Sequence, residues 1–162
     1  MIKIFLLLSI FISLSLAKSF HFSEVRYSDA LDKSRELHGL ISFGKESLKI
    51  AYEADKTILL YEDEDLTMFK DTEEVTLDES EAMKISQYFA IILLLYEGDV
   101  DKMNELFNIS QIEDKTLLLP KEEMQEYIQK IVLMRKAGEL KSLQLYLIND
   151  DNIKISIEDE VR

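Results

Sequence analysis

The chain has 162 residues, with 32 Asp and Glu against 19 Lys and Arg, and its formal net charge at pH 7 is −13. A surface this acidic repels nucleic acid and anionic lipid headgroups, so composition argues against a nucleic-acid-binding protein and favours solubility or a basic partner. The sequence contains no cysteine, which excludes disulfides, thiolate metal ligands and cysteine nucleophiles.

Residues 1–17, MIKIFLLLSIFISLSLA, have the layout of a secretory signal peptide. Lys3 supplies the early cation, residues 4–16 form an apolar run, and small residues precede a cleavage site after Ala17. A retained membrane anchor is the alternative, but the run is shorter than the ~20 residues that a span requires. We therefore expect one exported domain over residues 18–162, located in the periplasm of a Gram-negative source and not stably inserted in the membrane.

Most of the remaining sequence alternates between apolar and polar residues with a period of two, which is typical of half-buried strands. Leu48, Ile50 and Tyr52 share one face of such a segment, and Ile58 and Leu60 are predicted to face the same interior from the next. Short polar turns separate about ten such segments, so the pattern predicts an antiparallel meander.

The period changes to that of a helix in the middle of the chain. Asp78 or Ser80 can cap a helix over residues 81–97, and Gly98 can end it. A shorter helix is expected next, so a helical insert of about residues 78–107 divides the strands into two runs.

The second half of this helix has no polar side. Residues 88–96 are all apolar or aromatic, and Ile91 and Leu94 interrupt the polar column of the first half. Nine residues make about 14 Å of helix against ~30 Å of hydrocarbon, which excludes a membrane span. The extra apolar face requires cover by the protein core, by a partner protein or by an apolar ligand, and composition does not choose among these three.

Motifs for catalysis are absent from the sequence. No nucleophile elbow, zinc-protease motif or phosphate-binding glycine loop occurs, and His21 and His38 fall on the predicted solvent faces of their strands. The acidic run 62–65 lacks the spacing of a calcium loop and is typical of a charged turn. We expect no catalytic residue, no metal site and no cofactor.

An ordered set of segments resembles the outer-membrane lipoprotein carrier (LolA) family. These segments are FHFSEVRYSDALDKSRELHGLISF, FGKESLKIAY, TILLYEDEDLTMF, FNISQIEDKTLLLPK and LKSLQLYLINDDNIKISI, and they cover most of residues 20–158. The resemblance implies an α+β, mainly antiparallel β fold, an unclosed curved half-barrel whose mouth is covered by a helical lid.

The resemblance also implies a function. Members carry the acyl chains of lipoproteins in an apolar cavity, from an inner-membrane release complex to an outer-membrane receptor, as monomers without a cofactor. Each CH₂ group left in water costs about 0.8 kcal/mol, so acyl chains cannot cross the periplasm unshielded.

On this basis we predict which side chains meet the cargo. The candidates from the first run of strands are Phe43, Leu48, Ile50, Tyr52, Ile58, Leu60 and Met68. The candidates from the lid and the second run are Phe89, Ile92, Leu93, Tyr96, Leu133, Leu143, Leu145 and Leu147. For each of them the alternative is a packed core side chain without ligand contact.

The family's lid-controlling arginine, which a proline follows, corresponds here to Lys45, which Glu46 follows. Lid control by Lys45 is therefore in doubt, and a different cargo, such as a glycolipid or another envelope lipid, becomes an option. Two rivals come from other classes. One is an interaction or sensor module of the same fold that docks a protein through its apolar face, and the other is a small lipid-processing enzyme.

Overall fold

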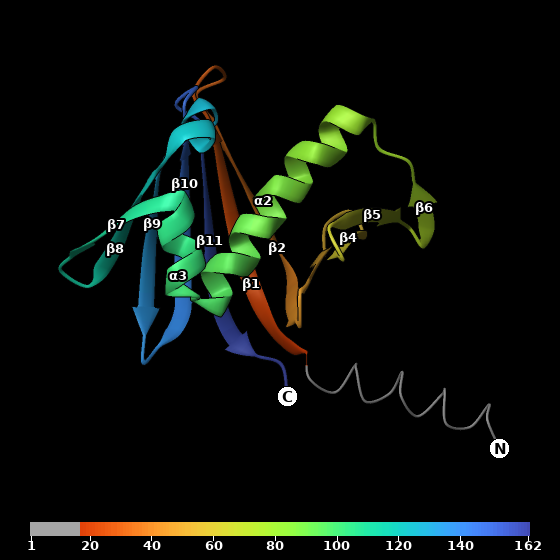
Figure 1. Cartoon of the computed structure of the whole chain (residues 1–162). Helices are drawn as coiled ribbons and strands as arrows, with labels where there is room; N and C mark the ends of the chain where they lie inside the picture. Colours follow the sequence, from red (N-terminus) through yellow and green to blue (C-terminus); the bar gives the residue numbers. More distant parts are fainter. Residues whose placement is uncertain (1–16) are drawn as a thin grey trace.

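Eleven strands form one continuous antiparallel sheet in the computed structural model, which describes residues 17–162 (Figure 1). The predicted signal peptide, except Ala17, lies outside these residues. The strands are β1 (Lys18–Ser28), β2 (Lys33–Gly44), β3 (Ser47–Tyr52), β4 (Thr57–Glu62), β5 (Asp65–Lys70), β6 (Glu73–Val75), β7 (Phe107–Ile112), β8 (Lys115–Pro120), β9 (Ile128–Lys136), β10 (Glu139–Leu147) and β11 (Asn152–Glu160). The helices of the same residues are α2 (Glu79–Glu97), α3 (Val100–Leu106) and the 3-10 helix η1 (Glu122–Glu126).

The sheet consists of two meanders joined at the middle. Its strand order is β6-β5-β4-β3-β2-β1-β11-β10-β9-β8-β7, so β1 pairs with both β2 and β11. The sheet curves strongly and does not close, and α2 lies across its hollow side (Figure 1). The predicted fold class, a mainly antiparallel half-barrel with a helical lid, is confirmed. The prediction missed the strand β6, which has three residues at one edge of the sheet, and the 3-10 helix η1.

The bounds of α2 follow from its capping residues. The Asp78 carboxylate accepts a hydrogen bond from the Glu81 backbone N–H at 2.9 Å, as an N-cap does. Gly98 has a φ of 69°, a left-handed conformation that glycine adopts without strain, and its N–H donates to the Leu94 carbonyl at 3.0 Å. Both α2 and α3 lie within the predicted helical insert of about residues 78–107.

The sheet has an inner face, which α2 covers, and an outer face toward solvent. Alternate residues of each long strand point to the inner face, and those of adjacent strands pair there, as Ile41 does with Ile50 and Leu143 with Ile155. All four of these side chains are buried in one hydrophobic cluster that also includes Phe22.

The predicted orientation of β4 is wrong. Ile50 of β3 pairs with Leu59, which is buried on the inner face, so Ile58 and Leu60 lie half-buried on the outer face. All residues from 58 to 61 are apolar or aromatic, so alternation alone could not decide which pair points inward. The register with β3 decides it.

This orientation predicts different costs for two neighbouring truncations. Leu59→Ala removes a buried side chain and is expected to lower the free energy of unfolding by about 2–5 kcal/mol. Leu60→Ala on the outer face is the matched control and should cost about 1 kcal/mol or less. Urea unfolding of the two variants measures the difference, and a larger loss for Leu60→Ala would contradict the register.

Candidate functional site

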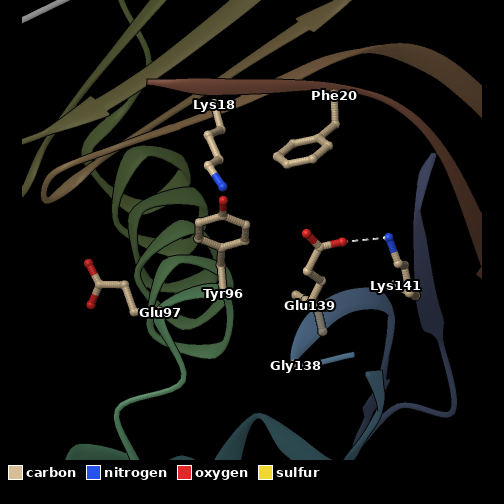
Figure 2. A pocket seen from close by; sticks show the side chains of 8 residues that line it. Lys18, Phe20, Tyr96, Glu97, Gly138, Glu139 and Lys141 are labelled. Carbon is tan, nitrogen blue, oxygen red and sulfur yellow. Dashed lines mark hydrogen bonds and ion pairs between the residues drawn. The ribbon is translucent and has the colours of Figure 1, made fainter. Parts of the chain in front are cut away.

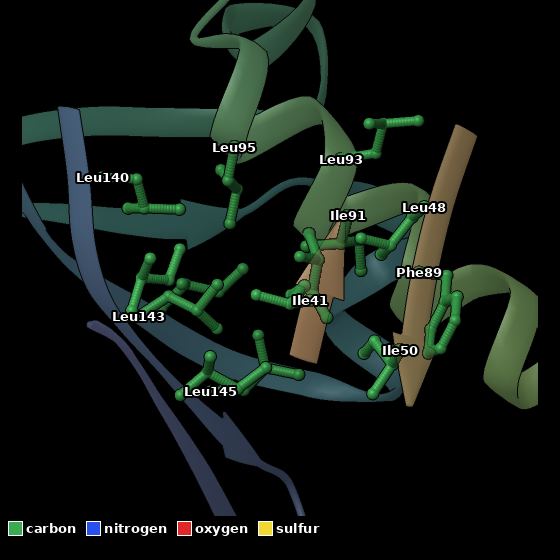
Figure 3. Close-up of a cluster of buried hydrophobic side chains, with 14 of the residues drawn as sticks. Ile41, Leu48, Ile50, Phe89, Ile91, Leu93, Leu95, Leu140, Leu143 and Leu145 are labelled. Atoms are coloured by element: carbon green, nitrogen blue, oxygen red, sulfur yellow. The ribbon is translucent and has the colours of Figure 1, made fainter. Parts of the chain in front are cut away.

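The second half of α2 fills the hollow of the half-barrel. Phe89, Ile92 and Leu95 are each 0–1% exposed, and Ile91 is 7% exposed. In Figure 3 the side chains of Ile91 and Leu95 lie between Leu48 and Ile50 on one side and Leu140, Leu143 and Leu145 on the other. A curved sheet therefore covers the helix from two sides, which accounts for the missing polar column at Ile91 and Leu94.

The predicted cargo-contacting residues gather around this helix, with the exception of Ile58 and Leu60. Those buried in the cluster are Phe43, Leu48, Ile50, Tyr52, Phe89, Ile92, Leu93, Leu133, Leu143 and Leu145. Met68, Tyr96 and Leu147 are partly buried and pack against the same cluster. The structure thus places thirteen of the fifteen candidates, counted from these two groups of ten and three, on the inner face or on α2.

An aromatic group holds the C-terminal end of α2. The Tyr96 ring stacks on Phe43 of β2 with centroids 3.6 Å apart and planes 4° apart, and Phe20 of β1 meets both rings edge-on at 6.2–6.3 Å. Next to this group a cleft of about 220 Å³ lies between β1, the end of α2 and the β9–β10 turn (Figure 2). The cleft includes Lys18 and Glu139, so it is partly charged.

Arg135 of β9 binds the backbone at the same end of α2. Its guanidinium donates one hydrogen bond to the Leu95 carbonyl and another to the Gly138 carbonyl, the latter at 3.2 Å. The last turn of α2 contains no basic residue, so Arg135 supplies the cation that a helix C-terminus favours. Burial lowers the pKa of Arg135.

Lys45, the predicted lid-control residue, lies elsewhere. It is exposed in the β2–β3 turn and forms no side-chain hydrogen bond or ion pair with any residue in 17–162. Arg135, in contrast, does bind the α2 backbone, and lid control by Lys45 stays a prediction. No spacing in the sequence indicated Arg135, because its contact with α2 depends on how the two elements pack.

A charged cluster lies within the apolar inner face. Glu24 is 0% exposed, and its carboxylate accepts hydrogen bonds from the Arg26 guanidinium and, at 3.0 Å, from the Tyr52 hydroxyl. Arg26 also donates to the Tyr52 hydroxyl at 3.0 Å. Burial is the largest single influence and opposes the charge of Arg26, but Glu24 and the neighbouring tyrosines together outweigh it and raise the Arg26 pKa. Burial and the Glu24 charge also raise the pKa of Tyr52.

Tyr88 of α2 packs over this cluster without joining it. Its hydroxyl is buried and has no hydrogen-bond partner among the described residues. Burial, and to a lesser extent the Glu24 charge, raises the Tyr88 pKa well above its usual value. An unpaired buried hydroxyl costs free energy, so the packing of α2 against the sheet is not optimised for stability at Tyr88.

Catalytic geometry was not found in the part of the chain described. His21 and His38 are both exposed, on the outer face of the sheet. No group of three or more His, Asp or Glu side chains within residues 17–162 is placed to hold a metal ion. No helix in that range is long and apolar enough to span a bilayer.

Comparison with solved structures finds similar chains, two of which are described here. No protein-family model and no curated protein matches the chain. A LolA superfamily protein of Nitrosomonas europaea is similar with a TM-score of 0.41 and 12% identity, over 89% of this chain and 84% of that one. An outer membrane lipoprotein-sorting protein domain of Vibrio parahaemolyticus is similar with a TM-score of 0.42 and 9% identity, over 90% and 84%. Values this low assign no activity to this chain.

Loss of the hydroxyl should affect the stability of the protein differently at Tyr88 and at Tyr52. Tyr88→Phe removes an unpaired buried group and is expected to leave the free energy of unfolding unchanged or to raise it by about 1 kcal/mol. Tyr52→Phe, the matched control, removes one hydrogen bond from Glu24 and one from Arg26 and should lower it by about 1–3 kcal/mol. Urea unfolding compares them, and equal losses would mean that Tyr88 has a partner.

Removal of the Arg135 guanidinium should loosen the C-terminal end of α2. Arg135→Met keeps the apolar stem but removes the donor to the Leu95 carbonyl, so we expect backbone amides of residues 89–98 to exchange several-fold faster. Hydrogen exchange followed by mass spectrometry measures this, with Lys136→Met, an exposed neighbour, as control. Unchanged exchange in Arg135→Met would mean that the apolar contacts alone hold the helix.

Proposed function

We propose that the protein is an exported, non-enzymatic carrier that binds acyl chains on the inner face of its half-barrel after α2 moves aside. The observation that carries this proposal is the packing of α2. A helix that is apolar on two sides lies in the hollow of an open, curved sheet, where its side chains occupy the volume that acyl chains would need.

The energetics support reversible binding. About 16 CH₂ groups leaving water contribute roughly 13 kcal/mol at about 0.8 kcal/mol each. Displaced side chains of α2 would lose part of their own burial, unless they close over the bound chains. The free energy of binding is then a small difference between two large contributions, the burial of the acyl chains and the lost burial of the α2 side chains. A small difference allows both loading and release, as a carrier requires.

The attachment of α2 is uneven, which supports its role as a lid. Polar and aromatic contacts with Arg135 and Phe43 hold its C-terminal end. The N-terminal half is mostly exposed, and Met83 there is 56% exposed. An opening motion that pivots at residue 98 would break apolar contacts while keeping the C-terminal anchor.

The cargo and route follow from the sequence resemblance described for the LolA family. They comprise a lipoprotein or a related envelope lipid, a location in the periplasm, an inner-membrane release complex and an outer-membrane receptor. The second candidate is a protein-docking module of the same fold. A filled interior favours it, as do the exposed Leu31, Tyr127 and Ile148.

A lid locked to the sheet should prevent binding. The sequence has no cysteine, so Tyr61→Cys and Phe89→Cys create a unique pair away from the C-terminal anchor of α2, where the two rings now meet edge-on with centroids 6.3 Å apart. After cross-linking with a short bis-maleimide, we expect a fluorescent neutral diacylglycerol to bind at least about tenfold more weakly than before. Fluorescence titration measures this affinity.

The matched control is the same double variant with both thiols capped singly by N-ethylmaleimide. Equal probe binding by locked and capped protein would overturn the lid mechanism. Native mass spectrometry of the protein from the periplasm reports cargo mass directly. If no acylated molecule binds by either method, the docking module replaces the carrier.

A further inference from the structure

A hollow of about 420 Å³ lies at the end of the sheet away from the C-terminus of α2. It opens where the β1–β2 and β10–β11 turns lie side by side, at the top of Figure 1, and the Asp29 N–H donates to the Asp151 carboxylate across them at 2.8 Å. Its volume is in the range of small-molecule sites. Leu31, Leu147 and Ile153 give it an apolar lining.

Cations gather on one side of this hollow. Arg26, Lys33 and Arg35 line it, while Asp151 is the only acid among the lining residues. Both Asp151 carboxylate oxygens already accept hydrogen bonds at 2.8 Å, from the Asp29 N–H and the Asn149 amide. In a chain with net charge −13, the hollow is a local site of opposite sign.

Two of these cations oppose each other directly. Arg26 of β1 pairs with Arg35 of β2 in the sheet register, and like charges in opposed positions destabilise a sheet. Arg26 is bound by Glu24, whereas neither Arg35 nor Lys33 has a carboxylate within 4 Å among residues 17–162. On the other side Arg26 pairs with Ile153, so the charge borders directly on the apolar lining.

We propose that this hollow binds the anionic head, a carboxylate or a phosphate, of a single-chain amphiphile. Lys33 and Arg35 pair with the head, and the first part of the chain lies against Leu31, Leu147 and Ile153. The inference rests on the proposed carrier function and adds the charge of the cargo and the end of the barrel at which it is held. An anion between Arg26 and Arg35 also relieves the repulsion in the register.

Three probes of equal chain length test this site, each below its micelle-forming concentration: dodecanoate, dodecyl phosphate and the neutral 1-dodecanoylglycerol. We expect at least one anionic probe to bind about tenfold more tightly than the neutral one in calorimetric titration, with a preference that falls as salt rises. Dodecanoate and dodecyl phosphate separate a carboxylate from a phosphate head.

The double variant Lys33→Gln, Arg35→Gln should abolish this preference without changing the affinity for 1-dodecanoylglycerol. Arg26 is left in place because Glu24 depends on it. Lys154→Gln, an exposed cation of β11 on the outer face, is the matched control and should keep the preference. The thermal midpoint of the double variant should stay equal or rise, because a like-charge contact is removed.

The outcomes separate the two proposals. Equal affinities for anionic and neutral probes, or an unchanged preference in the double variant, overturn the headgroup site and leave the carrier function standing. Failure of all three probes to bind overturns the headgroup site as well, while binding of the neutral diacylglycerol still decides the carrier function.

Discussion

The burial of one helix in a half-closed sheet determines the rest of this structure. An open, curved sheet exposes a continuous apolar inner face, which must be covered in water. α2 covers it with side chains from Phe89 to Leu95, and this is why its second half has no polar side. The chain supplies its own cover in place of a ligand. In the carrier that we propose, a cover made from the same chain is retained when the cargo leaves, so the empty protein does not expose its interior.

Polar and aromatic groups border the apolar contact between α2 and the sheet. They determine where this contact is strong and where it is weak. Arg135 and the Phe43–Tyr96 stack secure the C-terminal end of α2. Near the middle, Tyr88 buries a hydroxyl without a partner above Glu24, Arg26 and Tyr52, although a phenylalanine would fit the same space. The overall negative charge predicted repulsion of anionic headgroups. At the site that we propose, Lys33 and Arg35 offset that repulsion locally, because charge acts over short distances in salt solution.

Sequence reasoning predicted the architecture well because its signals are local. Alternation located ten strands, and Asp78 and Gly98 bounded the main helix through capping geometry. It was wrong about β4, where an unbroken apolar run hides the alternation and only the pairing of Ile50 with Leu59 sets the face. The inward orientation of Glu24 could have been predicted, since Glu24 follows Phe20 and Phe22 at the same spacing of two residues. Arg135 could not, because its contact with α2 joins segments forty residues apart.

The junction between β1 and β11 also governs how the chain can fold. Each meander forms from neighbouring hairpins, whose loops are short and inexpensive to close. Joining them requires residues 18–28 to pair with residues 152–160, across nearly the whole described sequence. Contacts of such separation form slowly, so the first strand has its second neighbour only after the last strand is available.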